Sequence, residues 1–291
     1  METAELLKKV RKVQIKTKGA VSQLFSGEYH SAFKGRGISF SEVREYEMGD
    51  DIRSIDWNVT ARMNHTYVKV FEEERELAVV LMVDVSQSTM FGTLKQFKRD
   101  LITEVSAVLA YSAIRNNDKV GMILFSDRIE QYIPPQKGSS HILRIIRELL
   151  DVNPASKGTN LSAAFQFLNN VIRKQSVVFV LSDFMAPDYE PMLRITARKH
   201  DVVGIHVYDK REMEIPNMGL VQVQDAETGK RIYVDTASAV LRKSYSGSYQ
   251  QHLVRVKSAF QRSGVDSVSI HTRDNYIHVL MTLFQQRTKR V

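Results

Sequence analysis

The chain of 291 residues contains no cysteine, and this absence excludes disulfides and every thiolate metal site. Any metal must therefore be held by oxygen or imidazole ligands. Long hydrophobic runs are also missing: the longest apolar stretch near the C-terminus, within residues 279–284, is interrupted by Thr282. This is far below the roughly 20 residues that span a bilayer, so no transmembrane helix is expected.

An apolar secretory signal is also missing from the start of the chain. Residues 1–20 carry six basic side chains and no apolar segment followed by a small-residue cleavage site. We therefore expect a cytoplasmic protein. The composition, 43% hydrophobic and 25% charged, is that of an ordinary globular protein with room for one large domain and a small appendage.

The formal net charge of +8 lies mostly at the two ends of the chain. Residues 1–20 hold six basic and two acidic side chains, and residues 284–291 hold three basic ones, which leaves about +1 for everything between them. A basic groove through the domain is therefore unsupported, and nucleic acid is not an expected partner. The simplest interpretation is that these terminal charges lie on two solvent-exposed helix ends and bind no partner.

From residue 77 onward, apolar strand-like runs alternate with segments of helical periodicity. This alternation predicts an α/β fold with a doubly wound, mainly parallel sheet and helices on both faces. The run at 77–84 has no polar alternation, as expected for a central strand buried on both sides. We expect strands at 77–84, 120–125, 129–133, 176–183, 202–208 and 265–271, and helices at 94–115, 139–150, 161–172, 190–199, 239–262 and 275–287.

Two further features complete the expected architecture. Residues 219–225 and 230–235 flank a Glu-Thr-Gly turn and predict a hairpin that extends one edge of the sheet. Residues 1–76 do not follow the alternation, and predict an N-terminal helix and a small irregular or β-type appendage before the main domain at 77–291. The only tryptophan, Trp57, is expected to be buried in this appendage after a turn at 49–51.

Polar side chains gather where three segments of the predicted domain reach the same edge of the sheet. Asp84, Ser86 and Ser88 follow the first strand with a spacing of two, and Asp183 ends a later strand. Thr159 stands just before the predicted helix at 161–172. In an open parallel sheet, ligands bind beyond the carboxyl ends of the strands, so these five side chains are expected to converge there.

Two carboxylates and three hydroxyls are suitable ligands for a hard divalent cation such as Mg²⁺, with Mn²⁺ or Ca²⁺ as alternatives. Each residue taken singly could be an ordinary helix cap or strand end. Their joint occurrence on three loops of one sheet favours a metal site.

The Asp-x-Ser-x-Ser pattern at 84–88, with Thr159 and Asp183 after it, resembles the metal-ion-dependent adhesion site of von Willebrand factor A domains. The resemblance implies that Ser86, Ser88 and Thr159 ligate the metal directly or through water. It also implies that Asp84 and Asp183 lie close by or in the first shell, and that a partner's carboxylate fills the sixth position.

A second resemblance covers the appendage. The segments FKGRGISFSEVREY at 33–46 and GDDIRSIDW at 49–57, with Ala61-Arg62 after them, are similar to the bacterial domain-of-unknown-function-58 family, DUF58. Members of that family resemble A-domain proteins that work alongside MoxR-type AAA+ ATPases. The resemblance therefore implies a non-enzymatic adaptor or chaperone-like partner of such an ATPase.

Two other functions stay open on the sequence alone. A metal-dependent phosphohydrolase could use Asp84 as its nucleophile, although position 86 is serine where a second carboxylate would act as general acid and base. A nucleic-acid-binding protein could use the basic ends of the chain, although the central region has no run of interleaved basic and aromatic residues. Recognised phosphate-binding loops and the Gly-x-Ser-x-Gly motif are absent.

Overall fold

The computed structural model describes residues 39–72, 77–93, 96–224 and 229–289. The chain divides into two compact units, one within Phe33–Leu77 and the other containing Ala78–Val291. The N-terminal helix expected from the sequence lies outside the described residues. Within the described part of the chain, no helix is both long enough and apolar enough to cross a membrane.

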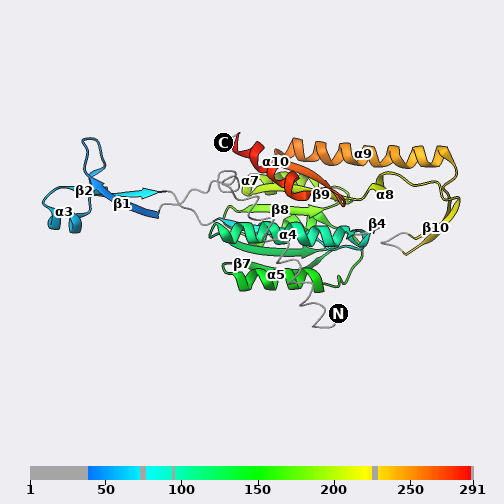
Figure 1. The fold of residues 1–291 in the computed structure, drawn as a ribbon, viewed down its shortest axis with the longest axis horizontal. Helices are drawn as coiled ribbons and strands as arrows, with labels where there is room; N and C mark the ends of the chain where they lie inside the picture. The colour runs from blue at the N-terminus through cyan, green and yellow to red at the C-terminus, as the bar shows by residue number, and fades with distance from the viewer. Residues whose placement is uncertain (1–38, 73–76, 94–95, 225–228, 290–291) are drawn as a thin grey trace. The chain divides into compact units, whose positions relative to one another are not determined.

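The larger unit contains a six-stranded sheet with the order β12-β9-β8-β3-β6-β7 (Figure 1). Neighbouring strands run parallel except for β7, which is antiparallel to β6. The strands are β3 (Ala78–Asp84), β6 (Lys119–Phe125), β7 (Ile129–Gln136), β8 (Val177–Ser182), β9 (Asp201–Tyr208) and β12 (Asp266–His271). The predicted doubly wound α/β fold is confirmed, with β3 in the middle of the sheet.

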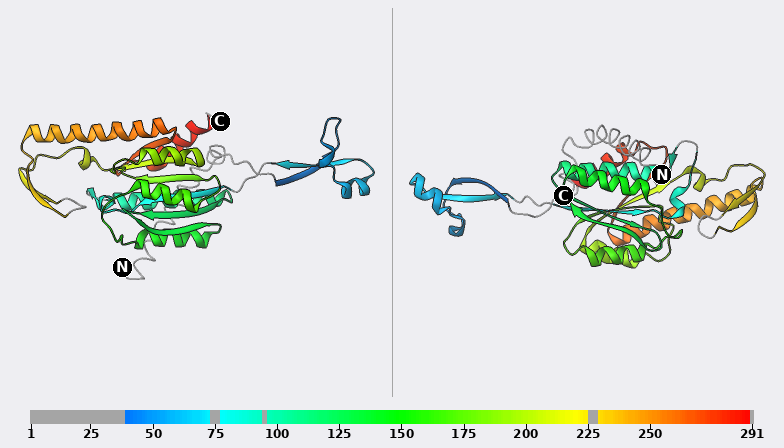
Figure 2. Two further views of the ribbon diagram at one scale, coloured as in Figure 1. Left: turned by 180° about the vertical axis from the view of Figure 1, so that it is seen from behind. Right: turned by 90° about the horizontal axis from the view of Figure 1, so that it is seen from below.

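Helices cover both faces of this sheet (Figure 2). The helices are α4 (Lys98–Arg115), α5 (Ser139–Asp151), α6 (Leu161–Val171), α7 (Glu190–Lys199), α8 (Lys210–Met213), α9 (Ala239–Ser263) and α10 (Tyr276–Thr288). Helix α4 packs against α5, whereas α7 packs against both α6 and α9. Only the short helix α8 was not predicted.

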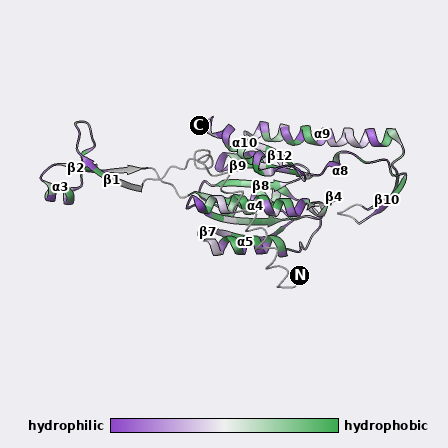
Figure 3. Ribbon diagram, in the orientation of Figure 1, coloured by the Kyte–Doolittle hydropathy of each residue, from purple (hydrophilic) through white to green (hydrophobic). Residues whose placement is uncertain are grey.

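The core follows from the apolar character of the central strands, which Figure 3 shows in green for β8. Residues 79–83 of β3 and 177–181 of β8 are all buried. Because side chains alternate across a strand, Val80 and Met82 of β3 face one side and join a hydrophobic cluster with α6, α7 and α9. The continuous apolar run thus reflects burial on both faces.

The edge strand β7 corrects one boundary. The sequence predicts that the strand ends before Pro134-Pro135, but β7 continues through both prolines to Gln136. The pairing with β6 shifts register between Val120 and Met122, opposite the prolines, so an irregular edge accommodates residues that cannot donate. Gly121 makes room for this arrangement, since a Cβ there would lie 2.9 Å from the Pro135 ring.

The predicted hairpin forms as β10 (Leu220–Gln224) and β11 (Arg231–Asp235), but it does not extend the main sheet. It is a separate two-stranded sheet that projects beyond the main sheet near the start of α9 (Figure 1). The two edges of the main sheet are β12, which pairs with β9, and β7, which pairs with β6.

The start of α4 is a second correction. The sequence predicts a helix from residue 94, whereas the helix begins at Lys98 after a short ladder between β4 (Gly92–Thr93) and β5 (Gln96–Phe97). Phe97 is the N-cap residue of α4 and is 54% exposed. Residues 94 and 95 lie outside the described part of the chain.

The smaller unit contains an antiparallel pair, β1 (Ser39–Glu45) and β2 (Tyr67–Glu72), with a 3-10 helix, η1 (Ile52–Ser54), and α3 (Trp57–Met63) between them. Asp51 caps η1 and Asp56 caps α3, which explains the acidic residues in this segment. Trp57 is 67% exposed, so its expected burial is wrong. As the first residue of α3, it directly follows the capping carboxylate.

Candidate functional site

The predicted site lies at the carboxyl ends of β3 and β8, which are neighbours in the sheet. The chain leaves β3 toward β6 on one side and leaves β8 toward β9 on the other, so this edge is a topological switch point where α/β folds bind ligands. Asp84 ends β3, and Asp183 follows β8 directly. Both carboxylates are buried, with 1% and 2% exposure.

Asp84 shapes the loop that follows it. Its Oδ1 accepts a hydrogen bond of 2.9 Å from the Ser86 backbone N–H, and its Oδ2 accepts one of 2.6 Å from the Ser182 hydroxyl. The first bond turns the backbone so that the Ser86 and Ser88 hydroxyl oxygens lie 3.0 Å apart. Two hydroxyls thus converge beside two buried carboxylates, as the spacing of two predicts.

The loop that carries Thr159 lies against the same turn. The backbone N–H of Gln87 donates to the Lys157 carbonyl at 3.1 Å, and the N–H of Asn160 donates to the Ser126 carbonyl at 2.8 Å. Asn160, not Thr159, caps α6, by accepting from the Ala163 N–H. Half-buried Thr159 forms no side-chain hydrogen bond to another described residue, so the structure brings its loop to the site without joining its hydroxyl to the serines.

The sequence missed Lys98, the first residue of α4, which is fully buried. Its ammonium donates to Asp183 Oδ2 at 2.9 Å and to Glu212 Oε1 at 2.5 Å. Because the predicted helix began at residue 94, Lys98 fell inside it, and nothing in the sequence marked it as part of the site. In the structure Lys98 is the first residue of α4, where a cation opposes the helix dipole. Glu212 belongs to α8, the helix that periodicity did not predict.

Burial and charge set the protonation of the two site carboxylates. Burial and then the charge of Asp183 raise the pKa of Asp84 to about 6, against the hydrogen bonds from Ser182 and Ser86. Burial would also raise the pKa of Asp183, but the charge and hydrogen bond of Lys98 outweigh it and lower that pKa. Both groups are therefore mainly ionised at neutral pH.

The charges of the cluster do not balance. Asp84, Asp183 and Glu212 face a single ammonium, that of Lys98, and no described cation forms an ion pair with Asp84. Among the described residues, no three His, Asp or Glu side chains come together as a metal-binding group. A cation would therefore depend on the Ser86 and Ser88 hydroxyls as well as on the carboxylates, and oxygen ligands with excess negative charge fit a hard divalent ion.

A helix from the end of the chain supports the Asp183 loop. His252 of α9 donates from Nε2 to the Asp183 carbonyl at 3.1 Å, and the Met185 N–H donates to Asp183 Oδ1 at 3.1 Å. His206 of β9 forms a hydrogen bond with the Ser269 hydroxyl through Nδ1, 3.2 Å away. Its buried Nε2 has no hydrogen-bond partner among the described residues.

Comparison with known proteins identifies the family of this chain. A family model described as "Protein of unknown function DUF58" matches residues 42–255. The chain belongs to the DUF58 family. The resemblance seen in residues 33–62 is thereby confirmed at the level of the family.

Relatives of this DUF58 protein occur in bacteria. An uncharacterized protein of Mycobacterium tuberculosis is 27% identical over 294 residues, covering 99% of this chain and 92% of the relative. The uncharacterized protein YeaD of Bacillus subtilis is 26% identical over 109 residues, covering 38% of this chain and 25% of the relative.

Two solved structures share the fold of the DUF58 protein. BatB from Bacteroides thetaiotaomicron has a TM-score of 0.50 and 15% identity, and covers 73% of this chain and 99% of its own. An aerotolerance-related membrane protein from Bacteroides fragilis has a TM-score of 0.51 and 16% identity, and covers 74% and 100%. At these identities the likeness shows the fold alone.

Proposed function

We propose that this DUF58 protein is a non-enzymatic protein-binding module that depends on one divalent cation, Mg²⁺ or alternatively Mn²⁺ or Ca²⁺. The cation is held by Ser86, Ser88 and Thr159, with Asp84 and Asp183 as its charged partners. One observation carries the proposal: two hydroxyls 3.0 Å apart lie beside two buried carboxylates, one of which has no cationic partner among the described residues.

The surroundings of the carboxylates assign them different roles. Asp183 already accepts from Lys98 and from the Met185 N–H, so it contributes mainly charge, directly or through water. Asp84 holds the loop in place through the Ser86 N–H and contributes charge that Lys98 does not neutralise. A cation with mostly neutral ligands keeps open positions, and an Asp or Glu of a partner gains both coordination and charge attraction there.

The partner is a MoxR-type AAA+ ATPase, and the DUF58 protein acts as its adaptor. This choice rests on the family resemblance, together with the resemblance of the 84–88 loop to the adhesion site of von Willebrand A domains. The site geometry supports the chemistry of the contact, an acidic side chain meeting a bound cation.

Both alternative functions have less support. A phosphohydrolase that uses Asp84 as its nucleophile would lack a general acid and base at position 86, where the chain has serine. The basic C-terminal end is partly neutralised, because Arg287 pairs with Asp201 at 2.5 Å and with Asp266 at 2.9 Å. Neither observation supports a catalytic or a nucleic-acid-binding role.

The test is the affinity of the purified MoxR-type ATPase from the same organism for the full-length chain, in Mg²⁺ and in EDTA. Chelation, Asp84→Ala and Thr159→Ala should each weaken binding by about 30-fold or more, because each removes part of a charge-mediated contact. The matched control is Asp151→Ala, which removes an exposed carboxylate from the end of α5. Equal affinity of wild type and Asp84→Ala, with and without metal, would refute the proposal.

A further inference from the structure

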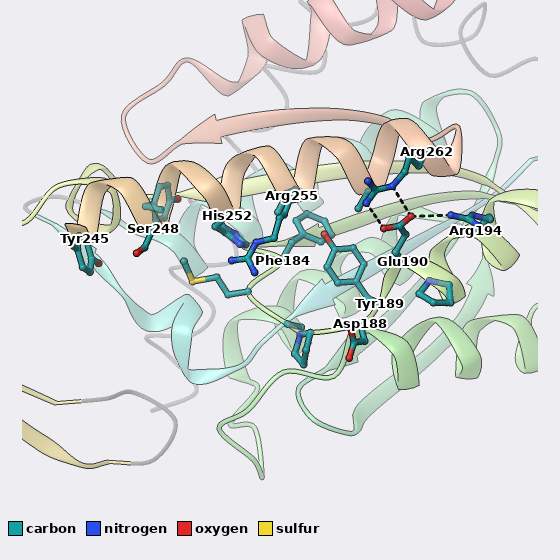
Figure 4. Close-up of a pocket in the computed structure, with 17 residues that line it drawn as sticks. Phe184, Asp188, Tyr189, Glu190, Arg194, Tyr245, Ser248, His252, Arg255 and Arg262 are labelled. Atoms are coloured by element: carbon teal, nitrogen blue, oxygen red, sulfur yellow. Dashed lines mark hydrogen bonds and ion pairs between the residues drawn. The ribbon is translucent and has the colours of Figure 1, made fainter. Parts of the chain in front are cut away.

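A groove of about 870 Å³ lies next to the candidate metal site, between α9 and the loop that joins β8 to α7. Its apolar floor is formed by Phe184, Tyr189, Tyr249 and Val256, all of which are buried. Figure 4 shows Tyr189 in the middle of the groove, with α9 residues along one side. The volume lies within the range of about 300–1,000 Å³ that is typical of ligand sites.

The loop that walls this groove is held in a strained conformation. Phe184 has a φ of 54° and Asp188 has a φ of 48°. Both angles lie in the left-handed region, which residues other than glycine rarely adopt. Such residues cost about 1–3 kcal/mol each and cluster at functional sites. Phe184 is fixed by a 2.9 Å bond from its N–H to the Ser182 hydroxyl and by an edge-on contact with Phe260, with ring centroids 4.9 Å apart.

The loop is shared by the groove and the candidate metal site. Phe184 directly follows Asp183, and His252 of α9 both lines the groove and donates to the Asp183 carbonyl at 3.1 Å. A segment of a protein partner that contacts the metal can therefore reach the groove within a few residues.

The arginines around the groove differ in whether they form ion pairs with acidic side chains. Glu190 accepts from Arg194 at 3.0 Å and from Arg262 at 2.6 Å and 2.9 Å, so these three side chains form one network (Figure 4). Arg255, one turn after His252, has no ion pair with any residue that the structure describes. Its exposed guanidinium is available to a ligand.

We propose that this groove binds an acidic-aromatic segment of the protein partner, with the aromatic ring on the floor around Tyr189 and a carboxylate on Arg255. An aromatic ring fits because the rings of Tyr189 and Tyr249 line the groove. A carboxylate fits because the planar guanidinium pairs with it through two hydrogen bonds. A second copy of this chain, with a net charge of +8, is a poor occupant. The inference rests on the proposed protein-binding role.

The test uses the full-length protein and two peptide probes, N-acetyl-Phe-Glu amide and its uncharged twin, N-acetyl-Phe-Gln amide. Binding is followed through the backbone amide NMR signals of Phe184 and Met185. Wild type should show saturable shifts with the Glu peptide, and about threefold weaker binding of the Gln twin, as for an exposed ion pair. Arg255→Glu should abolish this preference, whereas Lys257→Glu, an exposed charge reversal outside the groove lining, should keep it.

The metal site provides the second control. Because the probes do not need the cation, their binding should persist in EDTA and in the Ser86→Ala variant. The groove proposal is thus tested separately from the proposed metal-dependent contact. The groove proposal is overturned if neither peptide shifts the loop signals. Equal binding of the Glu peptide to Arg255→Glu and Lys257→Glu would also overturn it, as would loss of peptide binding in Ser86→Ala.

Discussion

Lys98 donates to Asp183 across 85 positions of the chain, with 2.9 Å between Nζ and Oδ2. Both side chains are buried, and the ammonium also binds Glu212. An internal cation thus lies beside the candidate metal site and compensates part of its negative charge. A buried ion pair adds little net stability over an apolar replacement, but removal of one partner leaves an uncompensated charge.

Replacement of Lys98 by methionine should therefore lower the free energy of unfolding by about 3–5 kcal/mol, because Asp183 and Glu212 would stay buried without their cation. Lys98→Met with Glu212→Gln should regain part of that loss. Urea unfolding in EDTA measures both variants, with Lys243→Met on the exposed face of α9 as the control. A loss for Lys98→Met no greater than that of the control would show that the ion pair does not have this role.

The charge of Asp84 should make the metal-free protein less stable as the pH rises. The pKa of Asp84 is raised from 3.8 to about 6 in the folded state. The contribution of the protonated carboxyl to the free energy of unfolding is therefore fully present below about pH 4 and is lost as the pH rises through 6. The loss is about 1–3 kcal/mol, at 1.36 kcal/mol per pH unit. Asp84→Asn cannot ionise, so its stability relative to wild type should increase between pH 4 and pH 7.

Urea unfolding in EDTA at several pH values between 4 and 7 checks this prediction. Saturating Mg²⁺ should remove most of the loss in wild type, because a bound cation stabilises the ionised carboxylate and binds only the folded state. A constant difference between wild type and Asp84→Asn across this range would contradict the account of Asp84.

The fold was predictable because its strands carry an unambiguous signal. The apolar run of β3 and the helical periodicity of α7 gave boundaries within one residue of the structure. The errors arose where tertiary context decides. Pro134 and Pro135 are tolerated because β7 lies at the edge of the sheet, and the hairpin that was expected to extend one edge forms a separate sheet.

The site was predictable only where the spacing of residues within one loop determines how their side chains lie. The spacing of Asp84, Ser86 and Ser88 fixes one loop, and the strand order brings Asp183 beside it. Lys98 and Glu212 belong to helices whose approach depends on the whole fold, so no spacing in the chain relates them to Asp183.

Close packing between α9 and β9 predicts opposite effects for two Gly→Ala substitutions. A Cβ at Gly204 would lie 2.4 Å from the Phe260 ring, so Gly204→Ala should destabilise the fold by about 1–3 kcal/mol. Gly247 lies within α9 and a Cβ there would meet nothing within 4 Å, so Gly247→Ala should stabilise the helix by up to about 1 kcal/mol. Thermal unfolding compares the two, and a Gly204→Ala variant as stable as wild type would show that α9 does not pack on β9 in this way.

The central claim is that one divalent cation binds where the 84–88 loop, Thr159 and Asp183 meet. Anomalous diffraction from crystals of the full-length protein soaked in Mn²⁺ tests it most directly. The account predicts one strong peak at the carboxyl ends of β3 and β8, about 2.0–2.6 Å from the Ser86 and Ser88 hydroxyl oxygens. The peak should be missing from crystals of the Ser86→Ala variant. Wild-type crystals with no peak at this position, or with a peak bound only by other residues, would contradict the account.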